Sequence, residues 1–266
     1  MPETNASGWN IAYETLGNPE HPPIVMILGL SYRMAHWGRL PALLAEKLYV
    51  VLFDCRGMGG SEKRDEPYTV VDEVADVLAV MDASGVERAT VYGRSRGGML
   101  AQEFALQRPE RVTNLVLVGT GHRGPGSVGW NERVTKAMNF GRDLTKEQIF
   151  AEQLEAMAAP GWRERDPEAF NYALNIDLEA SPRRFAVQRQ MGALDGWTSS
   201  GRLSVISCPA LVLCGEDDGM QPPENSLLLA AEIPNARLEL IPNCGHNPML
   251  EQPEEVARRV FTFLGV

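Results

Sequence analysis

Short apolar runs alternate with amphipathic stretches along most of this chain. Continuous runs rich in Val, Ile and Leu are typical of parallel strands that are buried on both faces. We expect strands at residues 9–16, 24–28, 49–53, 89–92, 115–118, 210–213 and 238–241. We expect helices at residues 40–47, 70–84, 99–107, 225–233 and 253–264. This alternation predicts an α/β fold, with a mostly parallel central sheet and helices on both faces.

Residues 122–202 interrupt the alternation. The segment has no strand pattern and several helical ones, and it carries Trp130 among a number of other aromatic residues. We interpret it as a helical cap over the carboxyl edge of the sheet, inserted into an α/β core of residues 1–121 and 203–266. A second domain elsewhere on the surface is the alternative that the pattern leaves open.

The composition narrows the functional classes. The chain has 266 residues, of which 44% are hydrophobic and 23% charged, as in ordinary globular proteins with a sizeable core. The formal net charge is −10 without a basic cluster, which argues against nucleic-acid and membrane partners. No apolar run is long enough to span a bilayer, and the first residues lack a signal-peptide pattern. We therefore expect a cytoplasmic monomer or homodimer that acts on a small molecule.

Cysteines and histidines are too dispersed to suggest a metal centre. The four cysteines have no C-x-x-C spacing and lie in or beside apolar runs, as is typical of buried reduced thiols. The four histidines form no metal-binding motif. We expect neither a metal nor an organic cofactor.

Residues 93–98 read G-R-S-R-G-G and stand between an expected strand and an expected helix. This is the strand–turn–helix context of a nucleophile elbow with the pattern G-x-S-x-G. Glycines let the strand and the helix approach closely, while the strained turn raises the serine hydroxyl above the sheet. Ser95 is therefore the candidate nucleophile. A glycine-rich turn with an incidental serine is the alternative.

A serine hydroxyl needs a base to take its proton, and a carboxylate must orient that base. His246 lies in a loop after the last expected strand, where its side chain can reach over the sheet edge, although many loop histidines are merely solvated. The expected strand at 210–213 is followed by Glu216, Asp217 and Asp218. We choose Asp218 first and Asp217 second, since acids at such a turn also cap the next helix. The chain order Ser95, Asp218, His246 suits this fold.

Four motifs in this order resemble those of the α/β-hydrolase fold superfamily. Residues 53–61, F-D-C-R-G-M-G-G-S, resemble its D-x-R-G-x-G-x-S turn, and the elbow follows. Residues 215–222, G-E-D-D-G-M-Q-P, resemble its G-x-x-D-x-x-x-P turn, which favours Asp218 over Asp217. His246, preceded by Gly and followed by E-Q-P at 251–253, resembles the G-H-x(4)-E-x-P ending. The resemblance covers essentially the whole chain, and it implies that residues 122–202 shape the substrate pocket.

The resemblance also implies an oxyanion hole formed by the backbone N–H groups of Leu30 and Arg96. The family often has His-Gly after its first central strand, where this chain has Leu-Gly-Leu at 28–30. Backbone donors do not depend on the side chain, so the missing histidine does not remove the hole. The segment 29–37 looks most like small lipophilic esterases, lactonases and polyketide methylesterases. We expect the substrate pocket to be lined by Gly29, Trp37, Arg94 and Trp130.

Arg94 and Arg96 depart from the family pattern, because neutral residues usually flank the nucleophile. Buried guanidinium groups are normally paired with acids. We expect internal ion pairs, with Asp54 or Glu103 as partners. The sharper hypothesis is that Arg96 faces the pocket and binds a carboxylate or enolate of the substrate.

Together these features predict a cofactor-free serine hydrolase that cleaves a carboxylic ester or lactone of a hydrophobic small molecule. Ser95 would form an acyl-enzyme with this substrate. C–C hydrolases and thioesterases of the same superfamily use a similar triad. The main alternative is a lyase, cyclase or dehydratase of natural-product biosynthesis, in which His246 acts as a base and Ser95 is not acylated. A ligand receptor built on the same fold is a further alternative.

Overall fold

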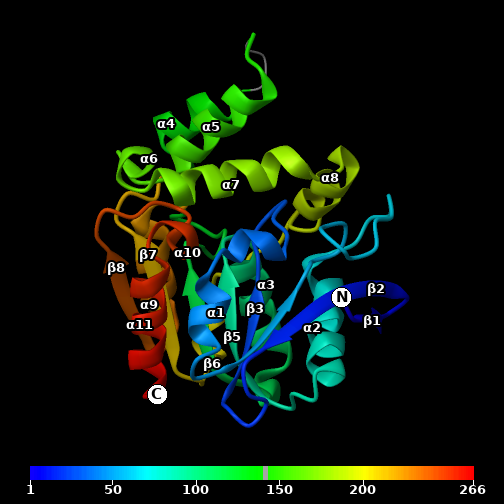
Figure 1. The fold of residues 1–266 in the computed structure, drawn as a ribbon. Helices are drawn as coiled ribbons and strands as arrows, with labels where there is room; N and C mark the ends of the chain where they lie inside the picture. Colours follow the sequence, from blue (N-terminus) through cyan, green and yellow to red (C-terminus); the bar gives the residue numbers. More distant parts are fainter. Residues whose placement is uncertain (140–142) are drawn as a thin grey trace.

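The computed structural model describes residues 1–139 and 143–266. Its central feature is an eight-stranded sheet in the order β1-β2-β4-β3-β5-β6-β7-β8 (Figure 1). The strands are β1 (Glu3–Ala6), β2 (Trp9–Leu16), β3 (Pro23–Ile27), β4 (Tyr49–Phe53), β5 (Ala89–Arg94), β6 (Val112–Val118), β7 (Ala210–Gly215) and β8 (Ala236–Ile241). β2 pairs antiparallel with β1 and β4, and all other neighbours are parallel. The predicted α/β fold with a mostly parallel sheet is confirmed.

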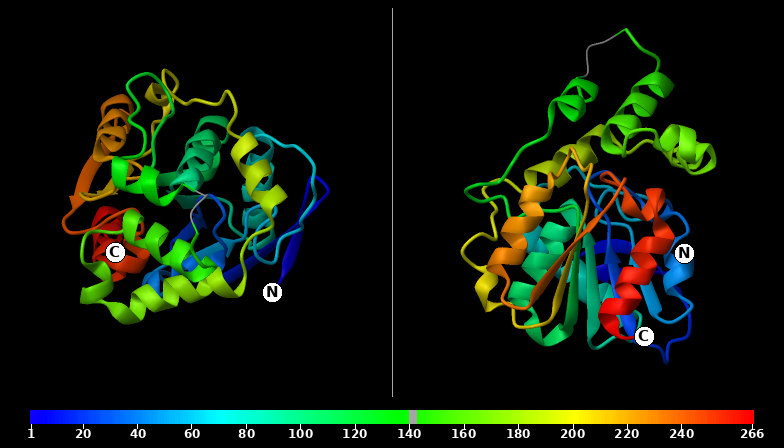
Figure 2. Two further views of the ribbon diagram at one scale, coloured as in Figure 1. Left: turned by 90° about the horizontal axis from the view of Figure 1, so that it is seen from above. Right: turned by 90° about the vertical axis from the view of Figure 1, so that its left-hand side faces the viewer.

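Helices cover both faces of this sheet (Figure 2). One face packs against α1 (Leu40–Leu44) and α11 (Pro253–Leu264), whose buried residues share a hydrophobic cluster with the strands. The other face packs against α2 (Val70–Ala83), α3 (Arg96–Gln107) and α9 (Pro223–Glu232) in a second cluster. The short helices of the core are η1 (Met34–Trp37), η2 (Pro109–Arg111), η3 (Leu203–Val205) and α10 (Pro248–Glu251).

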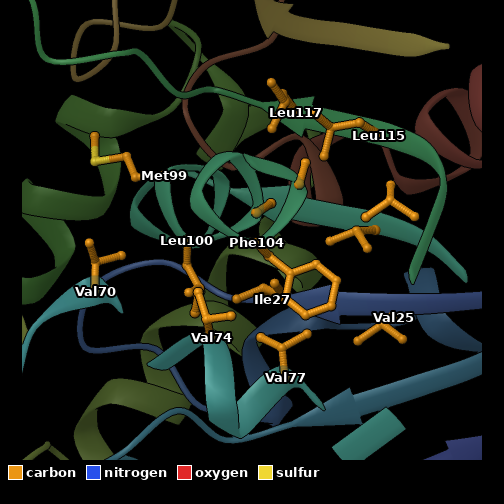
Figure 3. Packing of buried hydrophobic residues seen from close by; sticks show 14 of the residues in the cluster. Val25, Ile27, Val70, Val74, Val77, Met99, Leu100, Phe104, Leu115 and Leu117 are labelled. Carbon is orange, nitrogen blue, oxygen red and sulfur yellow. The ribbon is translucent and has the colours of Figure 1, made fainter. Parts of the chain in front are cut away.

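Strand β3 shows why the apolar runs of the sequence are continuous. Val25 and Ile27 point into the cluster formed with α2 and α3, where they approach Phe104 (Figure 3). Ile24 and Met26 point into the cluster on the opposite face, and all four strand residues are fully buried. Successive strand residues face opposite sides of a sheet, so a strand covered on both faces has no polar positions.

Between β6 and β7 the described residues form helices and loops without a strand. The helices are α4 (Glu132–Ala137), α5 (Lys146–Met157), α6 (Trp162–Arg165), α7 (Pro167–Glu179) and α8 (Arg184–Gly192). They lie together beyond the carboxyl ends of the parallel strands (Figures 1 and 2). The helical character of the segment agrees with the sequence pattern. The division into a core and a cap at residues 122–202 stays a prediction, and residues 140–142 of that range lie outside the described residues.

A few element boundaries differ from those expected. Strand β1 was not expected, because its four residues, E-T-N-A, carry no apolar pattern and it lies at the sheet edge beside β2. Helix α3 begins at Arg96 rather than at residue 99, because its first turn, R-G-G, is not apolar. Helix α1 ends at Leu44, before the expected position 47. These differences arise where local composition is a poor guide to pairing or packing.

No helix of the described chain is both long and apolar enough to cross a membrane. All four cysteines are free, and Cys208 is the one that is not fully buried.

Candidate active site

Ser95 occupies the turn between β5 and α3. Its φ angle is 55°, in the left-handed region that is strained for a residue with a side chain. A Cβ atom on Gly97 would collide with the carbonyl oxygens of Ile27 and Leu28, and one on Gly93 would collide with the carbonyl oxygen of Gly97. The glycines of the motif therefore allow α3 to start directly against β3 and β5, with Ser95 at the end of the strand.

His246 connects Ser95 to Asp218. Its Nε2 lies 3.1 Å from Oγ of Ser95, and its Nδ1 lies 2.8 Å from Oδ2 of Asp218. Both His246 and Asp218 are almost completely buried. A carboxylate only accepts hydrogen bonds, so Nδ1 carries the proton and Nε2 presents its lone pair to the serine hydroxyl. The structure thus brings together the three residues that the sequence separates by up to 151 positions.

The carboxylate of Asp218 is held on both oxygens. Oδ1 accepts hydrogen bonds from the backbone N–H groups of Met220 (2.9 Å) and Gln221 (2.8 Å), while Oδ2 faces the imidazole. Asp217 instead donates its backbone N–H to the carbonyl oxygen of Cys244. The geometry therefore favours Asp218 over Asp217 as the partner of the histidine.

Gly119 follows β6 and lies beside this pair, a role that the sequence reasoning did not anticipate. Its φ angle is 51°, and a Cβ atom there would come within 3.0 Å of Oδ2 of Asp218 and 3.3 Å of Nδ1 of His246. A side chain at this position would press on the histidine–carboxylate hydrogen bond. A glycine directly after a buried strand was the signal that could have suggested a close approach.

Two backbone donors near Ser95 remain available. Neither the N–H of Leu30 nor that of Arg96 donates a hydrogen bond to any residue that the structure describes. Arg96 is the first residue of α3, where backbone N–H groups have no partner within the helix. Gly29, beside Leu30, approaches the nucleophile so closely that a Cβ atom on it would lie 3.0 Å from Cβ of Ser95. These donors fit the oxyanion hole that the resemblance implies.

Gln190 of α8 supports the segment that carries Leu30. Its Oε1 accepts a hydrogen bond of 2.8 Å from the backbone N–H of Ser31, and the Gln190 side chain is fully buried. The sequence reasoning missed this residue, because no local pattern links it to a loop 159 positions earlier.

Glu251 supports the loop that carries His246. Its carboxylate accepts hydrogen bonds from the backbone N–H groups of Gly245 (2.9 Å), Asn247 (3.1 Å) and Ala159 (2.8 Å). The N–H of His246 itself donates to the carbonyl oxygen of Met157 at the end of α5. The base is therefore held from the core and from the segment between β6 and β7.

Arg96 does not face a pocket, which corrects the hypothesis that it binds a substrate anion. Its side chain is buried and forms an ion pair with the equally buried Glu73 of α2. Its Nε also donates to the carbonyl oxygen of Gln190. The expectation of a buried ion pair holds for Arg96, but its partner is neither Asp54 nor Glu103.

Asp54 and Glu103, the expected partners of Arg94 and Arg96, contact other groups. Asp54 accepts hydrogen bonds from the backbone N–H groups of Met34 (2.6 Å) and Gly60 (2.8 Å). Glu103 forms an ion pair with Arg202 at 2.6 Å. Arg94 has no acid partner among the described residues.

Of the four expected pocket residues, the structure brings two to the nucleophile. A Cβ atom on Gly29 would lie 2.9 Å from Nη1 of Arg94, so both residues lie beside Ser95. Trp37 is fully buried in the core, where its ring meets that of Tyr92 edge to face, and it is a packing residue rather than a pocket wall. Trp130 is half exposed.

The surroundings of His246 favour its neutral form. Burial lowers its pKa below the ordinary value of 6.5, and the positive charge of Arg94 lowers it further, while Asp218 acts in the opposite direction. A neutral imidazole is the form that can accept a proton. The described residues include no cluster of His, Cys, Asp or Glu that could hold a metal ion.

Comparisons with known proteins agree with this fold. A sequence model of the α/β hydrolase fold matches residues 22–253, so the chain belongs to this family of enzymes. A poly(3-hydroxyalkanoate) depolymerase of Ectopseudomonas oleovorans is 32% identical over 93% of this chain and 86% of its own. A 3-oxoadipate enol-lactonase of Acinetobacter baylyi is 26% identical over 91% of this chain and 88% of its own.

Solved structures also share this fold. Est816, described as an N-acyl homoserine lactone degrading enzyme, superposes with a TM-score of 0.81 at 28% identity, covering 98% of this chain and all of its own. The enol-lactonase of Burkholderia xenovorans superposes with a TM-score of 0.83 at 25% identity, covering both chains completely. These four relatives are described as a depolymerase, two enol-lactonases and a lactone degrading enzyme.

Proposed function

We propose that this protein is a serine hydrolase that cleaves a carboxylic ester or lactone of a hydrophobic small molecule. The observation that carries the proposal is the continuous hydrogen-bonded path from Ser95 through His246 to Asp218. In this arrangement a base takes the proton of a nucleophile while a carboxylate orients the base. No metal or cofactor takes part.

The reaction would proceed in two halves. Oγ of Ser95 attacks the substrate carbonyl while Nε2 of His246 takes the hydroxyl proton. The N–H groups of Leu30 and Arg96 would hold the resulting oxyanion, and one such donor contributes roughly 3 kcal/mol of transition-state stabilisation. Protonated His246 then delivers its proton to the leaving alcohol. A water activated by His246 finally cleaves the acyl-enzyme and releases the acid.

The relatives support the ester and lactone classes. Their names describe a poly(3-hydroxyalkanoate) depolymerase, an enol-lactonase and an N-acyl homoserine lactone degrading enzyme.

Labelling with a fluorophosphonate probe tests the proposal directly. We expect the intact mass of the wild-type protein to increase by one adduct, and Ser95→Ala to remain unlabelled. The unlabelled wild-type protein should hydrolyse members of a panel of p-nitrophenyl esters and lactones, whereas the labelled protein and Ser95→Ala should not. An unlabelled but folded wild-type protein would contradict the proposal and favour the lyase or cyclase alternative, in which His246 acts without acylation of Ser95.

A further inference from the structure

Arg94 is a buried cation without a neutralising anion. The residue is 2% exposed, and no carboxylate of the described chain forms an ion pair with it. Its Nε and Nη2 both donate to the carbonyl oxygen of His246, at 3.3 and 2.8 Å, and Nη2 also donates to Oδ1 of Asn247. Its guanidinium carbon lies 4.8 Å from the ring centre of Tyr32. These contacts engage the N–H groups of Nε and Nη2 without cancelling the charge.

The neighbouring Arg96 shows the usual solution for a buried guanidinium. Its charge is compensated by Glu73, and burial of such a pair is common in proteins. Burying Arg94 without an acid has a free-energy cost that the fold tolerates. A buried charge without a counter-ion acts on its neighbours with little screening by solvent. The guanidinium group of Arg94 contacts His246 directly, through the carbonyl oxygen of that residue.

Among the other titratable groups around His246, Asp218 acts in the direction opposite to Arg94. Asp218 accepts the hydrogen bond from Nδ1 of the ring, and the Glu251 carboxylate is used by the backbone N–H groups on either side of His246. Tyr32 donates to Oδ1 of Asn247, and burial raises its pKa to about 12, so it stays uncharged. The pKa of the adjacent Cys244 thiol is also raised by burial, so that thiol stays protonated.

We propose that Arg94 is a positioning residue of the hydrolytic reaction, which fixes the main chain of His246 against the nucleophile turn and favours the uncharged imidazole. The bidentate contact sets where the ring stands relative to Ser95. The uncompensated charge disfavours the imidazolium and so preserves the base in the free enzyme. This inference rests on the proposed function, in which His246 must be neutral to start the reaction.

Two substitutions separate the effect of the Arg94 charge from the effect of its hydrogen bonds to the carbonyl oxygen of His246. Arg94→Gln removes the charge but keeps an amide that can donate to the carbonyl oxygen of His246. Arg94→Lys keeps the charge but cannot make the two-pronged contact. We expect Arg94→Gln to raise the titration midpoint of His246 by about one pH unit, and Arg94→Lys to leave it close to the wild-type value. Arg94→Lys should lower kcat, because the two hydrogen bonds that hold the main chain of His246 are no longer both made, and Arg94→Gln should lower kcat less, because one of them can be kept.

Two-dimensional NMR of the histidine ring signals measures this midpoint without any turnover. The His246 signal is assigned with His246→Gln, and Arg258→Gln removes an exposed arginine as the matched control, with no shift expected. The acid limb of kcat/KM should move with the NMR midpoint. Since the titration does not depend on activity, its result is independent of the labelling result.

An unchanged midpoint in a folded Arg94→Gln variant would overturn the proposal and leave Arg94 as a packing residue. Folding is checked by circular dichroism and the thermal transition. If Arg94→Gln does not fold, Arg94→Met supplies the uncharged variant with a similar side-chain length. A shift of equal size in Arg94→Lys would also overturn it, since that variant retains the positive charge.

Discussion

Asp218 determines which nitrogen of His246 carries the proton. Its Oδ1 is fixed by two backbone N–H groups, so Oδ2 is presented to Nδ1 in one orientation. In Asp218→Asn the amide can donate to Nδ1 and thereby stabilise the tautomer that cannot accept the proton of Ser95. We expect kcat to fall by about 10⁴-fold, as is typical of this substitution in a serine triad. Steady-state kinetics with an ester identified by the panel measures the loss.

Asp217→Asn is the matched control for that experiment. Asp217 is the adjacent acid, and its backbone rather than its side chain contacts the histidine loop. We expect the activity of this variant to stay within about twofold of the wild-type value, because surface substitutions usually have small effects. A large loss in Asp217→Asn with little loss in Asp218→Asn would reverse the assignment of the acid.

For single residues, the sequence predicts those that belong to a motif. It does not predict residues that reach the site only through tertiary packing. Ser95, Asp218 and His246 each follow a strand, and the ends of parallel strands meet at one edge of the sheet. Gln190 reaches the loop of Leu30 from a helix of the inserted segment, and nothing in its local sequence encodes that contact. The environment of the two flanking arginines likewise depends on tertiary packing.

Among the secondary-structure elements, α2 and α3 are joined by the buried ion pair of Glu73 and Arg96. In Glu73→Gln the guanidinium of Arg96 remains buried without an anion. Breaking a buried pair in this way costs about 3 kcal/mol or more of unfolding free energy. We expect a loss of that size in urea denaturation.

Asp82→Asn, on the same helix α2, is the control for this measurement. Asp82 pairs with Arg111 but is 67% exposed, and an exposed pair contributes roughly 1 kcal/mol or less. The double variant Glu73→Leu/Arg96→Met should regain much of the stability that Glu73→Gln loses, since apolar residues replace both charges. If Glu73→Gln were as stable as Asp82→Asn, the pair would not link the two helices.

The elements themselves were largely predictable, because buried parallel strands and amphipathic helices leave periodic patterns. The partner of Arg96 was not, since several acids occur at plausible distances along the chain and the choice of Glu73 depends on how α2 packs against α3. Strand β1 was also missed. Its polar residues pair only with β2 at the sheet edge, and backbone hydrogen bonds of that kind leave little trace in hydrophobicity.

In the whole molecule, the segment between β6 and β7 contacts the site from two sides. Met157 accepts a hydrogen bond from His246, Ala159 donates one to Glu251, and Gln190 accepts one from Ser31 beside Leu30. Ser95 and Asp218 lie in turns that follow β5 and β7, whereas His246 and the loop of Leu30 are also held by this segment. The relative position of segment and sheet therefore influences the geometry of the reaction.

Gln190→Leu tests this coupling on the oxyanion side. Leucine fills a similar volume but leaves the N–H of Ser31 without its acceptor, so the loop that carries Leu30 loses one hydrogen bond, worth about 1 kcal/mol. We expect kcat to fall roughly five- to tenfold with little change in KM, because the donor acts on the transition state. Arg189→Ala, the adjacent residue, removes only a surface ion pair with Asp65 and should leave kcat within about twofold. Equal kcat values for Gln190→Leu and the wild type would show that the loop keeps its position without α8.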